Sequence, residues 1–243
     1  MSTYVLVHGA WQSAGTWDLL TPFLYDAGHQ VVTPALEGLG IGNSNLTPSI
    51  SLSTHVEGIS AVLADAREPV LLVGHSYAGM VISGAAEKHP NKVRGLVYID
   101  AFLPDHGQSV VDLLPSEIAA YFRKIASDVG DGWRLPAGDG QLDLWGLQPG
   151  PARDFVRMRL CDFTLKCFEE PIQLPANRKS QLPASFLACV AQNYPARPFF
   201  APFADKARKS GWAVMDVDTG HDCHVEQPQR VASLLIAAAN AQP

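Results

Sequence analysis

Ser76 is the residue whose surroundings most strongly suggest covalent chemistry. It lies in Gly74-His75-Ser76-Tyr77-Ala78, so that small residues stand on both sides of the serine. A run of branched apolar residues at 70–73 predicts a buried strand before it, and the pattern from 79 to about 88 predicts a helix after it. Strand, sharp turn and helix together are the context of a nucleophilic serine. The pentapeptide alone fits an ordinary strand-to-helix turn, so the prediction depends on this context.

A serine hydroxyl is a weak nucleophile at neutral pH and needs a neighbouring base. His221 is the candidate, because it follows a predicted strand in a Gly-containing loop near the end of the chain. His224 is the main alternative, while His8 and His75 are expected to shape the pocket or to bond to the backbone. His221, Cys223 and His224 could suggest a metal site, but a helix start with no fourth ligand nearby is a poor fit to zinc. We therefore expect no metal and no cofactor.

The elements that must position these residues alternate between strands and helices. Helices are predicted at 16–27, 53–66, 79–88, 203–210 and 228–239, and strands at 4–7, 30–34, 70–73, 93–100, 185–191 and 212–217. This alternation predicts an α/β fold with a doubly wound, mostly parallel sheet that binds ligands at the C-terminal ends of its strands.

The alternation stops between residues 103 and 183. This segment holds one clear helical run, at 117–129, a Gly-rich stretch at 130–150 and scattered aromatic residues. An insertion of this length predicts either a lid or a partner surface, and the aromatic content favours a lid over an apolar site. We therefore expect a largely helical cap at 103–183 inserted into a core formed by 1–102 and 184–243.

Composition excludes several classes of function. The chain has 243 residues, 47% of them hydrophobic and 17% charged, and a formal net charge of −6, which argues against nucleic acid as a partner. Its four irregularly spaced cysteines predict free thiols in a reducing compartment. Without a signal sequence or a membrane-spanning run, we expect a cytoplasmic protein with no membrane association. The sequence leaves open a homodimer.

The chain resembles the α/β-hydrolases over its whole length. It is most similar to the subgroup that holds plant methylesterases, hydroxynitrile lyases and related bacterial carboxylesterases. The residues that carry the likeness are Val5-Leu6-Val7-His8-Gly9-Ala10-Trp11 followed by Thr16-Trp17, then Tyr98-Ile99-Asp100-Ala101-Phe102-Leu103-Pro104, and finally Gly220-His221 with Pro228 seven residues later. The order of nucleophile, acid and histidine in this fold agrees with Ser76 and His221.

The resemblance also implies an oxyanion hole and a pocket. The backbone N–H of Tyr77, directly after the nucleophile, and that of Ala10 in the first loop are the expected oxyanion donors. Gly9 and Trp11 in the same loop are expected to contact the substrate, although a tryptophan after a strand is often core packing.

The acid is where the chain departs from the family pattern. In most relatives an aspartate follows the strand equivalent to 185–191, but here that loop reads Gln192-Asn193-Tyr194-Pro195. Asp100, at the end of an earlier strand, is the best candidate, because some α/β-hydrolases carry their acid there and the position can orient His221. It could equally be a turn residue at the start of the cap. Asp205, Asp218 and a polar Asn193 or Gln192 remain alternatives.

The resemblance and the motifs together predict a serine carboxylesterase acting on a hydrophobic small-molecule ester through an acyl-enzyme. A hydroxynitrile lyase is disfavoured, because such lyases place a threonine where Gly9 stands and a lysine where Asp222 follows the histidine. A lactonase or an amidase would share the same acyl-transfer chemistry. A non-catalytic small-molecule-binding protein is the alternative from another class, and the intact serine–histidine pair argues against it.

Overall fold

A six-stranded sheet forms the centre of the computed structural model, which describes residues 1–40, 45–175 and 182–241. All five neighbouring pairs in this sheet are parallel. In order across the sheet the strands are β2 (Gln30–Val32), β1 (Thr3–Val7), β3 (Val70–His75), β4 (Val93–Ile99), β7 (Ala184–Cys189) and β8 (Ala213–Val217). The predicted α/β class with a doubly wound parallel sheet is confirmed.

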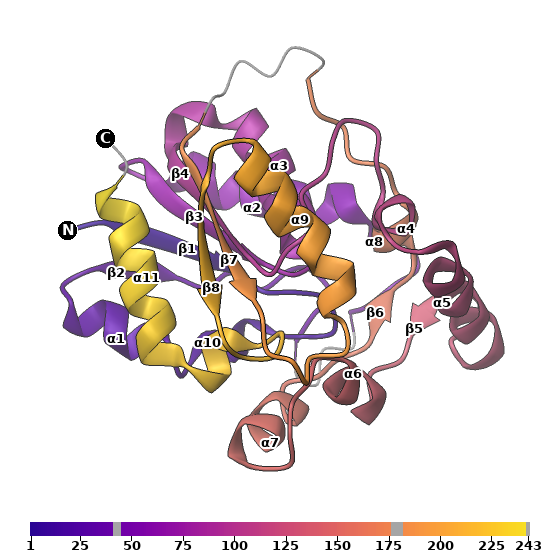
Figure 1. Cartoon of the computed structure of the whole chain (residues 1–243). Coiled ribbons are helices and arrows are strands. Elements are labelled where there is room, and N and C mark those ends of the chain that lie inside the picture. The colour runs from indigo at the N-terminus through magenta and orange to yellow at the C-terminus, as the bar shows by residue number, and fades with distance from the viewer. Residues whose placement is uncertain (41–44, 176–181, 242–243) are drawn as a thin grey trace.

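The central strands are apolar along their whole length because helices cover both faces of the sheet. All six residues of β3 are buried. Figure 1 shows α1 (Thr21–Asp26) and α11 (Pro228–Asn240) on one face, and α2 (Leu52–Asp65), α3 (Ala78–Lys88) and α9 (Arg197–Lys209) on the other. Short helices η1 (Ala14–Trp17), η2 (Pro90–Lys92) and α10 (Cys223–Glu226) lie in the connections. The C-terminal ends of β3, β4, β7 and β8 therefore meet at one edge of the sheet.

The segment after β4 leaves the sheet before the chain returns in β7. Its helices are α4 (Val110–Leu113), α5 (Ser116–Val129), α6 (Asp139–Leu144), α7 (Pro151–Arg157) and α8 (Lys166–Glu169), and β5 (Arg134–Leu135) pairs with β6 (Phe163–Thr164) in an antiparallel ribbon. Figure 1 shows most of these elements outside the main sheet. Residues 176–181 of the expected cap lie outside the described residues. A capping role for 103–183 stays a prediction.

None of the described helices combines the length and the apolar character needed to cross a membrane. The four cysteines are free thiols, as their spacing predicts.

Candidate active site

Ser76 lies in the turn between β3 and α3, at the C-terminal edge of the sheet. Its φ of 57° is in the left-handed region, which residues other than glycine seldom adopt. The turn is held by Ser76, whose carbonyl accepts hydrogen bonds from the N–H groups of Gly79 (3.1 Å) and Phe102 (3.2 Å). A Cβ on Gly74 would lie 2.8 Å from the carbonyl oxygen of Ala78. The small residues around the serine are therefore a steric requirement of this turn.

Asp100 and His221 meet at the same edge of the sheet, 121 positions apart in the chain. Asp100 directly follows β4, and a φ of 41° turns its side chain towards the loop after β8. Nδ1 of His221 lies 2.7 Å from Oδ2 of Asp100, and both side chains are buried. An ionised carboxylate accepts hydrogen bonds and cannot donate them, so the imidazole carries its proton on Nδ1 when Asp100 is ionised. Nε2 of His221 consequently presents a lone pair, and it is buried without a hydrogen-bond partner.

His75 connects this pair to the serine. Nε2 of His75 lies 3.0 Å from the carbonyl oxygen of His221, and the two imidazole centroids are 4.5 Å apart. Since His75 is the residue before Ser76, this hydrogen bond fixes the loop of His221 against the turn of the nucleophile candidate. His8 likewise bonds to the backbone, at the carbonyl of Gly9 (3.0 Å) and the N–H of Leu36 (3.2 Å).

Burial sets the electrostatics of the pair. Removal from water lowers the pKa of His221 far below its ordinary value, which keeps the imidazole neutral. The same effect raises the pKa of Asp100, whereas hydrogen bonds from Tyr194 and from the N–H of Cys189 lower it. Those donors are what favours an ionised carboxyl in this apolar setting.

The other candidates for the acid lie away from His221. Asp205 is on α9, where it pairs with Arg208 (3.0 Å). Asp218, Gln192 and Asn193 are exposed. Among the acids proposed from the sequence, Asp100 is the one that the structure brings to the histidine.

The expected oxyanion donors stand on either side of the serine. Tyr77 is the residue before α3, and Ala10 lies in the loop after β1; both are buried. Within the described residues, neither backbone N–H donates a hydrogen bond to the protein. Gly9 is in close contact with the nucleophile turn, since a Cβ at this position would lie 2.9 Å from Cβ of Ser76.

Aromatic rings from the segment 103–183 contact Trp11 and His221. Trp11 is 7% exposed, and its indole N–H donates to the carbonyl of Leu135 (3.0 Å). The indole of Trp145 lies 5.9 Å from the imidazole of His221, and its carbonyl accepts the His221 N–H (2.9 Å). The rings with centroids 5.4–6.5 Å from Trp11 are Phe122, Trp145, Phe163 and Phe168. Trp11 and His221 therefore both lie among aromatic rings.

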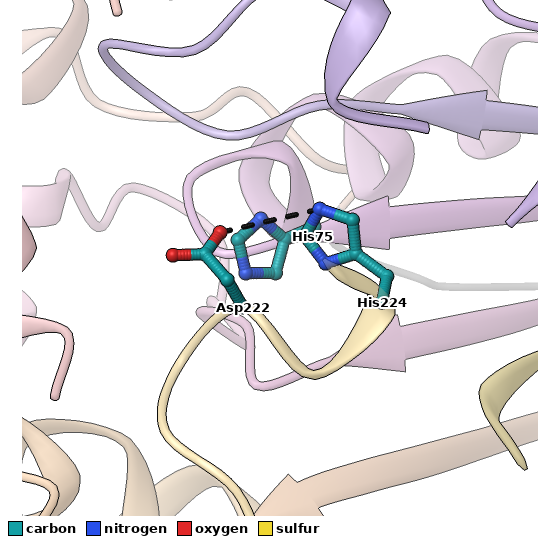
Figure 2. A group of neighbouring side chains, drawn as sticks. All are labelled: His75, Asp222 and His224. Atoms are coloured by element: carbon teal, nitrogen blue, oxygen red, sulfur yellow. Dashed lines mark ion pairs between the residues drawn. The ribbon is translucent and has the colours of Figure 1, made fainter. Parts of the chain in front are cut away.

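A second polar cluster lies behind the histidine. His75, Asp222 and His224 point towards one another (Figure 2), with one potential ligand atom of each within 4.8 Å of the others. Among the described residues this is the group that could hold a metal ion, and it differs from the set weighed and rejected from the sequence, His221, Cys223 and His224. Oδ1 of Asp222 already accepts from the amide of Gln12 (2.5 Å), and Nε2 of His224 contacts the hydroxyl of Thr16 (2.9 Å). A metal ion at these two atoms would compete with both contacts, whereas Oδ2 of Asp222 and Nδ1 of His75 and of His224 are buried without a hydrogen-bond partner among the described residues.

Sequence reasoning missed Tyr194 and Trp145. In the loop that contains Tyr194, the sequence points to the amide side chains of the exposed neighbours Gln192 and Asn193. No feature of that loop's sequence indicates that the phenol hydroxyl faces inward.

A parallel sheet flanked by helices, with a serine at a left-handed strand–helix turn and a buried histidine–aspartate pair, defines the α/β-hydrolase class. Residues 4–234 match the model of the alpha/beta hydrolase family, and the chain belongs to that family. It is 33% identical over 249 residues to the carbendazim hydrolyzing esterase of Nocardioides sp., covering 98% of this chain and 99% of that protein.

Two further comparisons agree with this placement. The chain is 32% identical over 130 residues to an alpha-hydroxynitrile lyase of Arabidopsis thaliana, covering 53% of this chain and 48% of the lyase. An extracellular alpha/beta-hydrolase from a Paenibacillus species superposes with a TM-score of 0.85 at 22% identity, covering 98% and 99% of the two chains, and this likeness concerns the fold. The predicted kinship is confirmed, and so is the predicted enzyme class, an esterase-type hydrolase.

Proposed function

We propose that the chain is a serine carboxylesterase in which Ser76 is the nucleophile, His221 the general base and Asp100 the acid of the triad. The observation that carries the proposal is the 2.7 Å contact between Asp100 and His221. With Asp100 ionised, this contact holds the proton on Nδ1 and leaves Nε2, which has no hydrogen-bond partner among the described residues, as the basic nitrogen. Apo serine hydrolases commonly show loose nucleophile–base geometry that tightens when substrate binds.

The reaction follows from this assignment. Nε2 of His221 takes the proton of the Ser76 hydroxyl as Oγ attacks the ester carbonyl. The N–H groups of Ala10 and Tyr77 donate to the oxyanion that develops. The imidazolium, stabilised by Asp100, then gives its proton to the departing alcohol. A water molecule, activated by the same base, hydrolyses the acyl-enzyme and restores Ser76.

The aromatic surroundings support an apolar and aromatic ester as substrate. Trp11 and the aromatic side chains of the expected cap form a cluster of large apolar rings. Sites of this composition select ligands by burying apolar area and orient them with a few polar contacts. The carbendazim hydrolyzing esterase among the relatives is consistent with a substrate that has an aromatic part.

Two features disfavour the lyase alternative. A threonine in place of Gly9 would bring its Cβ to 2.9 Å from Cβ of Ser76, so the lyase arrangement does not fit this backbone. The position after His221 holds Asp222, which is buried and would be a poor partner for departing cyanide. The binding-protein alternative predicts no turnover, and the same experiment tests it.

The experiment combines turnover with covalent labelling. Hydrolysis of p-nitrophenyl esters of increasing acyl length, and of an aromatic methyl ester, is measured for wild type, Ser76→Ala and His221→Ala. We expect losses of at least ~10⁴-fold in kcat for both variants, since serine and base act as one unit. Ser233→Ala, on the exposed side of α11, is the matched control.

A fluorophosphonate probe makes the test independent of the choice of ester. We expect it to add one equivalent to wild type and to Ser233→Ala, and none to Ser76→Ala. A wild-type protein that is neither labelled nor active on any ester would refute the proposal. Tight binding of an apolar ligand by that inactive protein would point to the binding-protein alternative.

A further inference from the structure

The hydroxyl of Tyr194 contacts both members of the acid–base pair. Its Oη lies 2.7 Å from Oδ2 of Asp100 and 2.9 Å from Nδ1 of His221, while Nδ1 and Oδ2 are 2.7 Å apart. The three atoms thus form a closed triangle. Tyr194 is 3% exposed, and its ring stacks on the imidazole with an interplanar angle of 26°. It comes from the loop after β7, a third element besides those that carry the aspartate and the histidine.

Counting protons assigns the direction of each hydrogen bond. The phenol has one proton and the imidazole nitrogen at most one, while an ionised carboxylate has none. If Tyr194 donated to Nδ1 of His221, that nitrogen would need a lone pair, which would then face the carboxylate lone pairs at 2.7 Å. The consistent arrangement has Tyr194 donating to Asp100. The Nδ1–H of His221 then donates to Oδ2 and is shared with the phenol oxygen.

This arrangement gives Tyr194 two effects on the pair. Its proton stabilises the charge on a carboxyl that burial would otherwise neutralise, and it is the largest influence lowering the pKa of Asp100. Its oxygen accepts from the imidazole and disfavours the tautomer with the proton on Nε2. Burial raises the pKa of Tyr194 well above its ordinary value, so the phenol remains a donor throughout the range in which such an enzyme works.

We propose that Tyr194 is a positioning residue of this site, which holds Asp100 in its ionised form and His221 in the tautomer that can act as base. The proposal rests on the proposed function of Ser76, His221 and Asp100. Tyr194 acts through the other two residues and has no contact with the reacting atoms. Its hydroxyl stands in the loop where most relatives carry the aspartate itself.

Tyr194→Phe tests the proposal because it removes the hydroxyl and keeps the ring. Loss of a hydrogen bond to a charged group predicts a fall of about 10- to 100-fold in kcat. Asp100 loses its main donor, so its pKa rises and the carboxyl becomes ionised only at higher pH. The acidic limb of the kcat–pH profile should therefore move to higher pH.

Tyr98→Phe is the matched control. Tyr98 is also buried, and its hydroxyl bonds to Ser83 (2.8 Å) on α3, away from His221. Both variants should lose comparable thermal stability, and only Tyr194→Phe should move the acidic limb. A Tyr194→Phe enzyme with wild-type kcat overturns the proposal. So does one that loses activity and stability together while its acidic limb stays where it is in wild type.

A double-mutant cycle tests the role of Tyr194 separately from the proposed triad of Ser76, His221 and Asp100. If Tyr194 acts through the carboxylate, Tyr194→Phe in an Asp100→Asn background should cost less than threefold further activity. Fully additive losses would overturn the positioning role. A wild-type protein that is not labelled by the fluorophosphonate probe would refute the catalytic serine. If wild type is labelled and active and Tyr194→Phe has the same kcat and pH profile as wild type, only the role of Tyr194 is refuted.

Discussion

Asp100→Asn is the sharpest perturbation of the proposed site, because the structure dictates which way the new amide faces. Oδ1 of Asp100 accepts from the N–H of Cys189 (3.3 Å), and Oδ2 faces Tyr194 and His221. If the amide NH₂ lay beside the Cys189 N–H, two hydrogen-bond donors would face each other with no acceptor between them. The NH₂ therefore takes the place of Oδ2 and donates towards Nδ1 of His221. That nitrogen must then give up its proton, and the imidazole is left protonated on Nε2.

A histidine in this tautomer cannot accept the serine proton. The same substitution in serine proteases costs about 10⁴ in kcat for this reason. We expect a loss between ~10² and ~10⁴ here, since the protein must either hold the wrong tautomer or accept a poorly oriented amide. The assay is kcat for p-nitrophenyl ester hydrolysis between pH 5 and 9. The acidic limb assigned to Asp100 should also disappear, because asparagine does not titrate.

Asp105→Asn is the control for this variant. Asp105 lies five residues further along the chain, exposed and paired with Lys206 (2.8 Å), and its variant should retain wild-type kcat. An Asp100→Asn enzyme within threefold of wild type would show that another group orients the histidine, and the proposed triad would then be wrong.

Three further predictions test the packing, the buried charge and the polar cluster. Gly79→Ala should destabilise the fold by about 3 kcal/mol or more, because its Cβ would lie 2.0 Å from the carbonyl oxygen of Phe102. Gly58 is exposed on α2 with open space around it, so Gly58→Ala should instead raise the free energy of unfolding by about 0.5–1 kcal/mol. Both free energies are measured by urea unfolding, and equal values for the two variants would contradict this packing. Burial raises the pKa of Asp222 to about 7, so the folded state binds more protons than the unfolded state between pH 4 and 7, and stability falls as the pH rises through that window. The free energy of unfolding of Asp222→Asn, relative to that of wild type, should therefore rise by up to about 4 kcal/mol as the pH is raised from 4 to 8. The exposed variant Asp218→Asn should show no such trend. Dialysis against EDTA should leave kcat unchanged, because we expect no metal at His75, Asp222 and His224. This expectation is wrong if the purified protein contains stoichiometric metal and loses both metal and activity on dialysis.

The elements around the nucleophile were predictable because they follow from local patterns. The apolar run at 70–73 and the helical pattern from 79 correspond to β3 and α3. The helix predicted at 203–210 was placed too late. α9 begins at Arg197, six residues earlier, because Pro198 is tolerated in the first turn and Pro202 is accommodated inside the helix. Proline marks a boundary only on average, and here tertiary packing overrides it.

The segment 103–183 was poorly predictable for a different reason. Of its helices only α5 has a clear pattern, and the other four are seven residues long or shorter. Its ribbon pairs Arg134 with Thr164 and Leu135 with Phe163, through two residues on each side. Elements this short derive their stability from contacts with distant residues, such as the Trp11 indole with Leu135. Periodicity within a window of sequence does not contain that information.

The site divides along the same line. Ser76 and His221 are marked by the glycines beside them, whereas the choice of acid depends on which strands are neighbours. β4 pairs with β7, and the Asp100 N–H donates to the carbonyl of Leu187 (2.8 Å), so the end of β4 lies beside the strand after which the family resemblance predicts the acid. An aspartate on either strand can therefore reach a histidine after β8.

This neighbourhood also explains why the loop after β7 still matters when it has no carboxylate. Asp100 is buried, and burial favours its protonated form and would weaken it as a partner for an imidazolium. Tyr194, reaching in from the vacated loop, supplies the donor that opposes this effect. The two positions are then coupled in this chain: an acid after β7 would not need the phenol, whereas the acid after β4 does. Adding Tyr194→Asp to the Asp100→Asn variant should accordingly recover part of the lost activity. Adding Asn193→Asp, on the exposed side of the same loop, to the same variant should recover none.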